Sequence, residues 1–140
     1  MTRTQAVRLH SNGEPEVLQW EEIEVDAPGF GEALIRQSAI GLNFIDIHHR
    51  TGRYRSAHFP VIPGMEGAGR VEAVGPGVSD FRPGDRVAYM AHAPGAYCGT
   101  RTIPVSRLVR LPDAISDDAA AAIMLKGLTA QYLLRGAYAV

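Results

Sequence analysis

Proline–glycine turn signals divide this chain into short segments and constrain its fold more than any other feature. Five such sites occur: Pro28-Gly29, Pro63-Gly64, Gly75-Pro76-Gly77, Pro83-Gly84 and Pro94-Gly95. Proline fixes φ and glycine accepts left-handed backbone, so these pairs favour tight turns. Short segments between regularly placed turns are typical of a β-sandwich or β-barrel. The 140 residues are enough for one such domain.

The apolar pattern between these turns predicts β-strands. Strands are expected over residues 5–10, 33–40, 69–74 and 85–90, with further pieces in 96–104 and 108–111. Leu18 and Trp20 occupy one phase of another strand, whereas Ile23 and Val25 occupy the opposite phase. A β-bulge near residue 21 would bring all four side chains onto one face, because one extra residue shifts the phase.

Two regions have the pattern of helices. Residues 43–50 predict a short helix that ends at a glycine. After Pro112, Ser116 is placed to cap a helix that continues through the apolar residues 119–125. Gly127 is expected to interrupt this helix, so a second helical stretch would follow it. The fold class is therefore mainly β with short helices and a helical C-terminal tail.

Composition excludes several classes of partner and site. The formal net charge is -1 and the charges are scattered, which argues against a nucleic-acid partner. The longest mostly apolar run is far shorter than the ~20 residues of a membrane span. The first ten residues lack the apolar core of a secretory signal, so a cytoplasmic location is expected. A single cysteine excludes an intramolecular disulfide and a cysteine-rich metal site.

Several catalytic motifs are absent. No G-x-G-x-x-G follows a predicted strand and opens a helix, so the usual pyrophosphate-binding turn is missing. The chain also contains no G-x-S-x-G, no H-E-x-x-H and no P-loop. Gly67, Gly69 and the Gly75-Pro76-Gly77 turn are better explained as backbone turns than as phosphate-binding loops.

Five segments together resemble one family. They are residues 13–18 (GEPEVL), 39–46 (AIGLNFID), 63–69 (PGMEGAG), 82–87 (RPGDRV) and 125–134 (LKGLTAQYLL). They are similar to NADPH:quinone oxidoreductases of the zeta-crystallin type, in the medium-chain dehydrogenase/reductase superfamily. The resemblance covers essentially the whole chain, and the combination is far more specific than any one segment.

This resemblance implies an architecture. The chain would be the N-terminal portion, a GroES-like, partly open β-barrel over residues 1–125. Residues 126–140 would be a helical linker toward a Rossmann domain that lies outside this chain. In the family, NADPH and substrate lie in the cleft between the two domains, and the full-length form is expected to be a homodimer. The isolated chain is accordingly expected to be inactive and to bind NADPH in the millimolar range at best.

The resemblance also bears on zinc. Alcohol dehydrogenases of the same superfamily hold a catalytic zinc with a cysteine and a histidine, and Asn43 and Met65 stand at these two positions here. An amide and a thioether are poor substitutes for thiolate and imidazole as zinc ligands, so no metal is expected. Without a Lewis acid, a quinone or a conjugated enone is an easier hydride acceptor than a simple carbonyl.

Site residues follow from the resemblance position by position. It places the cofactor beside Asn43, Phe44, Ile45, Asp46, His48, Lys126, Thr129 and Tyr132. It implies catalytic roles for Asn43, His48, Tyr54 and Lys126. His48 departs from the bacterial members, which carry tyrosine there. Gly127 would leave room for Lys126 to point into the cleft.

Most of these residues also have a purely structural interpretation. Asn43 and Asp46 would cap the short helix, and Phe44 and Ile45 would be ordinary core. His48 and Lys126 would be solvated helix residues, and Tyr54 would pack with a wet hydroxyl. Two residues outside the site have their own expectations: Glu66 should make internal hydrogen bonds, and Cys98 should be buried and inert.

The sequence is compatible with three functions. The first is an NADPH-dependent quinone reductase of which this chain is one domain. The second is a zinc-free enoyl or alkenal reductase of the same superfamily. The third is a non-catalytic barrel module. The helical tail is also expected to expose Leu128, Leu133 and Leu134, which would favour association.

Overall fold

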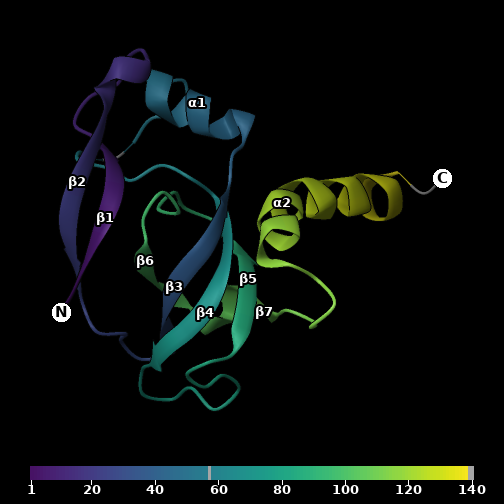
Figure 1. Ribbon diagram of the computed structural model, residues 1–140. Helices are drawn as coiled ribbons and strands as arrows, with labels where there is room; N and C mark the ends of the chain where they lie inside the picture. Colours follow the sequence, from purple (N-terminus) through teal and green to yellow (C-terminus); the bar gives the residue numbers. More distant parts are fainter. Residues whose placement is uncertain (57, 139–140) are drawn as a thin grey trace.

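Two antiparallel sheets form the body of the molecule in the computed structural model, which describes residues 1–56 and 58–138 (Figure 1). The strands are β1 (Thr2–Leu9), β2 (Leu18–Val25), β3 (Glu32–Gly41), β4 (Glu66–Val74), β5 (Arg86–Met90), β6 (Thr100–Pro104) and β7 (Leu108–Arg110). The helices are α1 (Phe44–Thr51) and α2 (Asp117–Tyr132), with short helical turns η1 (Pro15–Val17), η2 (Val105–Arg107) and η3 (Leu133–Ala137).

The larger sheet contains five strands in the order β6-β3-β4-β5-β7, and β1 pairs with β2 in a separate ribbon. The core lies around fully buried Ile35, Val87 and Tyr89. Isolated bridges join the ribbon to the rest of the body, at Ala6 with Cys98 and at Leu9 with Val61. The two sheets do not close on each other. The expected partly open, mainly β architecture is confirmed.

The predicted bulge in β2 is wrong. The β1–β2 pairing keeps one register along its whole length, from Thr2↔Val25 to Leu9↔Leu18. Side chains therefore alternate along β2, and Leu18 and Trp20 lie on the face opposite to Ile23 and Val25. Ile23 and Val25 are half-buried, whereas Leu18 and Trp20 are exposed, Trp20 to 71%.

Helix α1 begins and ends close to its predicted bounds. Asn43 is the N-cap, and Gly52 ends the helix with φ of 83°, a left-handed conformation that glycine adopts without steric cost. The next element in the chain, β4, begins at Glu66, three residues before the predicted start of that strand. The extra residues matter, because they bring Glu66 into the sheet opposite Gly41.

Gly127 does not interrupt α2, so the predicted break is wrong. The helix runs unbroken from Asp117 to Tyr132 and continues into η3. One glycine costs a helix about 1 kcal/mol, which good helix formers on both sides can offset. The boundary proposed at residues 125 and 126 falls inside this helix and stays a prediction. Residues 139 and 140 of the predicted tail lie outside the described part of the chain.

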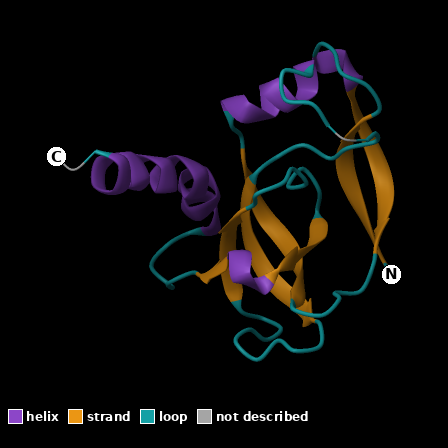
Figure 2. Ribbon diagram, turned by 180° about the vertical axis from the view of Figure 1, so that it is seen from behind, coloured by secondary structure: helices purple, strands orange, loops and turns teal. Residues whose placement is uncertain are grey.

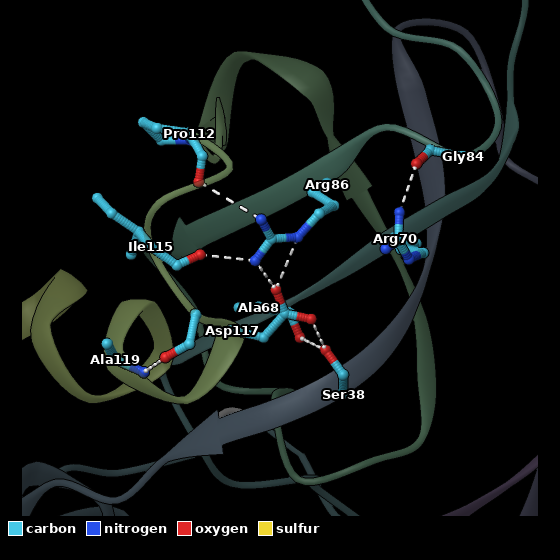
Figure 3. A network of polar contacts seen from close by, with 10 residues as sticks. Ser38, Ala68, Arg70, Gly84, Arg86, Pro112, Ile115, Asp117 and Ala119 are labelled. Carbon is cyan, nitrogen blue, oxygen red and sulfur yellow. Dashed lines mark hydrogen bonds and ion pairs between the residues drawn. The ribbon is translucent and has the colours of Figure 1, made fainter.

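Polar contacts fix the start of α2 against the sheet (Figure 3). The Ser116 hydroxyl accepts from the Ala119 amide at 3.2 Å, which confirms the predicted cap. Asp117, in the first turn, bonds to Arg86 on β5 and to Ser38 on β3. Buried alanines pack this end of α2 on the sheet, and the other end extends away from it (Figures 1 and 2).

Candidate functional site

The candidate site lies where the end of β3, the start of β4, the start of α1 and the middle of α2 meet. Gly41 and Glu66 face each other in the β3–β4 register. Asn43 lies two residues after Gly41 in the sequence. A side chain on Gly41 would overlap the carbonyl oxygen of Ala121 and the carboxyl group of Glu66. The absent side chain therefore allows α2 to approach the two strands closely.

Glu66 is the centre of this arrangement. Its side chain is fully buried, and its two oxygens accept three hydrogen bonds. Oε1 accepts from Asn43 Nδ2 and from Lys126 Nζ, each at 2.7 Å. Oε2 accepts from the backbone amide of Leu125 at 2.5 Å. The expectation that Glu66 makes internal hydrogen bonds is confirmed.

Asp46 forms a second buried polar group beside the first. Its Oδ2 accepts from the backbone amide of Asn43 at 2.9 Å and from the Tyr97 hydroxyl at 2.7 Å. Burial and the adjacent Asp46 carboxylate raise the pKa of Tyr97, so this phenol stays protonated and donates. The other oxygen, Oδ1, is buried without a hydrogen-bond partner among the described residues. Such an atom is available to a donor on a ligand.

Aromatic rings line the outer side of α1. The rings of Phe44 and His48 lie 5.1 Å apart, and those of His48 and Tyr54 lie 5.2 Å apart, both edge to face. The His49 ring contacts Tyr54 as well, and burial lowers the pKa of His49. Phe44 is nevertheless 72% exposed, so this row offers aromatic surface that the described residues leave uncovered.

Two cavities adjoin Asn43 and Lys126. The first, of about 450 Å³, is lined by α1 and by apolar side chains that include Leu18, Leu42 and Pro63, with Asn43 and Asp46 among its polar groups. The second, of about 410 Å³, lies between the end of β3 and α2, and Lys126 lines it. Both are open hollows of a size suited to a small organic molecule.

The structure brings some predicted site residues together and leaves others apart. Glu66 connects Asn43 to Lys126, and Asp46 lies beside them. Lys126 reaches this position without any break at Gly127. Ile45 is half-buried in α1.

The last two predicted residues lie farther along α2. Thr129 donates its hydroxyl to the carbonyl of Leu125, and Tyr132 is exposed nearly two turns beyond Lys126. The catalytic and cofactor-binding roles of all the predicted residues stay predictions.

Sequence reasoning missed Tyr97 and understated Glu66. Tyr97 lies 51 residues from Asp46, and no local pattern signals that contact. A weak signal existed for Glu66, which is an acidic residue between Met65 and Gly67 where a buried strand was expected soon after. Met65 is itself buried. The described residues contain no group of three or more His, Cys, Asp or Glu side chains placed to hold a metal ion.

Comparison with known proteins identifies the fold and its family. The family model described as the alcohol dehydrogenase GroES-like domain matches residues 29–137. The chain belongs to this family. The GroES-like domain described here also resembles the quinone oxidoreductase of Escherichia coli complexed with NADPH, with a TM-score of 0.95 and 43% identity. That match covers 97% of this chain and 42% of the other.

Two curated relatives extend the comparison. The quinone oxidoreductase of Pseudomonas aeruginosa is 48% identical over 132 residues, which are 94% of this GroES-like domain chain and 41% of the relative. A 2-haloacrylate reductase of Burkholderia is 42% identical over 140 residues, 96% of this chain and 42% of the relative. The chain thus spans about two fifths of the length of these relatives. None of the described helices is both long and apolar enough to cross a membrane.

Proposed function

We propose that this chain is the substrate-side domain of an NADPH-dependent quinone reductase. The observation that carries the proposal is the arrangement of Asn43 and Lys126 on one buried carboxylate, at the edge of two open cavities. The similarity to quinone oxidoreductases over nearly the whole chain supports it. A cytoplasmic location and a homodimer belong to the same proposal, and exposed Leu133 and Leu134 support association.

The residues present are suited to a dinucleotide. Asp46 Oδ1 is a buried acceptor that no described residue bonds, and it would take a ribose hydroxyl or an amide N–H. Exposed Leu42 and Phe44 would cover an apolar ring. Asn43 and Lys126 would hold the polar groups of the cofactor or the substrate. When bound, NADPH supplies the hydride.

Lys126 and Asn43 would then favour reduction by electrostatics. Reduction of a quinone places negative charge on oxygen, and donors fixed in advance stabilise such charge. The Lys126 ammonium gives one N–H to Glu66 and keeps two for a ligand. Asn43 likewise keeps one N–H and its amide oxygen. This chemistry needs no metal, and we propose that the enzyme is zinc-independent.

A conjugated alkene is a second candidate substrate, because one relative is a 2-haloacrylate reductase. Hydride addition to a conjugated alkene also develops delocalised negative charge, which the same two donors would stabilise. An open apolar hollow beside them places little restriction on the remainder of the substrate. The two candidates therefore differ in the acceptor and agree in the residues used.

The test follows NADPH oxidation by absorbance, with 1,4-benzoquinone and with 2-chloroacrylate as acceptors. It compares the chain alone with the chain fused to the part of the Pseudomonas aeruginosa quinone oxidoreductase that lies beyond the match. Quinone-dependent oxidation by the fusion alone is expected, and a chelator should leave its rate unchanged. Oxidation only with 2-chloroacrylate would favour the second candidate, and no oxidation with either acceptor would refute both.

A further inference from the structure

A fully buried carboxylate needs compensation, and at Glu66 this compensation comes from two different helices. Removing a charged carboxylate from water is costly unless it is paired and hydrogen-bonded. Asn43, at the start of α1, lies 23 residues from Glu66, and Lys126, in α2, lies 60 residues from it. Both donate to the same oxygen. Glu66 therefore links the start of α1 to the middle of α2.

The third donor connects Glu66 to the backbone of α2. The amide of Leu125 donates to Oε2, so the helix itself, and not only a flexible side chain, is bonded to β4. Gly41 supplies the space, since any side chain there would overlap the Glu66 carboxyl group and the Ala121 carbonyl. The position of the residue next to Leu125, which is Lys126, is thereby fixed at its backbone as well as at its ammonium.

Lys126 is chemically unusual within this chain. It is the only lysine in the sequence, and the other 13 of the 14 lysines and arginines are arginines. An ammonium is compact and has three donors, whereas a guanidinium is a broad planar fork. A compact group is suited to an oxygen that already accepts from Asn43. The Lys126 side chain remains 51% exposed, so its other donors can reach the cavity while Glu66 holds it.

We infer that Glu66 is a positioning residue of this site. Its carboxylate holds the Asn43 amide and the Lys126 ammonium on one oxygen and so sets the direction in which both meet a ligand. The consequence for reduction rests on the proposed function. The positioning itself is a property of this chain and is measurable without cofactor or substrate.

The experiment uses the single lysine as its probe. Labelling with ¹⁵N-lysine gives one side-chain ammonium signal in the NMR spectrum of the 140-residue chain, and a hydrogen-bonded ammonium exchanges its protons slowly with water. Glu66→Gln keeps the side-chain volume but removes the charge. We expect it to speed ammonium exchange at Lys126 at least tenfold. The matched control is Glu72→Gln, because Glu72 lies on the same strand and is paired with Arg36; it should leave the rate within twofold.

A second variant separates Glu66 from Lys126. Lys126→Gln should leave amide exchange at Leu125 within threefold of the wild type, whereas Glu66→Gln should speed it at least tenfold. Equal Lys126 exchange rates in the wild type and a folded Glu66→Gln variant would overturn the inference. Should Glu66→Gln unfold, ¹⁵N relaxation of the wild-type ammonium decides: restricted motion supports positioning, and motion as free as that of a surface lysine overturns it. Failure of quinone reduction would refute only the proposed function.

Discussion

Arg86 donates from both Nε and Nη2 to the same oxygen of Asp117, Oδ1, at 3.1 and 2.5 Å (Figure 3). The other oxygen, Oδ2, is thereby left to accept from the Ser38 hydroxyl at 2.5 Å. The bond from Ser38 and those from Arg86 hold the pKa of Asp117 below its ordinary value. One carboxylate in the first turn of α2 therefore contacts β3 and β5, the two strands that flank β4.

Asp117→Asn should weaken the fold in a pH-dependent way. Because the pKa of Asp117 is lower in the folded chain than in the unfolded chain, its charge stabilises the fold above the ordinary value of 3.8. This stabilisation is lost as the pH falls through the lower folded value. We expect the variant to lose about 1–2 kcal/mol of unfolding free energy at neutral pH, and the difference should shrink below pH 3.8. Urea unfolding across this range measures it, and a pH-independent difference would contradict the explanation.

The same substitution at two glycines should have opposite effects. Gly127→Ala should stabilise the chain by up to about 1 kcal/mol, because alanine is the better helix former and the neighbouring Ile123 side chain is exposed and free to move. Gly41→Ala should destabilise it by about 1–3 kcal/mol, because the added methyl group meets a backbone carbonyl and buried Glu66. Thermal unfolding compares the two variants, and a shift of the same sign in both would refute this account.

Cys98 should be unreactive in the folded chain. It is buried, as expected from the sequence, and burial raises the pKa of its thiol, so little thiolate forms at neutral pH. A thiol reagent such as DTNB should react roughly 100-fold more slowly with the native chain than with the chain in urea. Similar rates in the two conditions would contradict the structure at this position.

Tyr89 should make the fold sensitive to alkali. Burial raises its pKa to about 12, against an ordinary value of 10.0. Its neutral form therefore stabilises the fold fully below pH 10.0, and this contribution is lost as the pH rises through about 12. Tyr89→Phe also removes the hydrogen bond to Gln37 and should cost about 1–2 kcal/mol at neutral pH. Urea unfolding at rising pH should show a shallower loss of stability in the variant than in the wild type.

Local patterns were enough for most of the fold. Turn pairs and alternation located the strands, and Ser116 marked the start of α2, because caps and turns depend on neighbouring residues. The bulge expected near residue 21 is absent because the β1–β2 pairing keeps one register and leaves Leu18 and Trp20 on an exposed face of the ribbon. The break expected at Gly127 is absent because good helix formers on both sides offset the cost of one glycine. In the candidate site, the resemblance supplied Asn43 and Lys126. Glu66, which both residues contact, lies 60 residues from Lys126 in the sequence, and no periodicity reveals a contact over that separation.

Helix α2 is attached to the sheet over its first half. Its two attachments, at Asp117 and at Leu125, are eight residues apart, which is about 12 Å along a helix. The exposed portion of the helix from Leu128 onward extends beyond the attachment at Leu125. A displacement of the free end of α2 would therefore act first on the hydrogen bonds of Glu66, and through them on the orientation of the Lys126 ammonium.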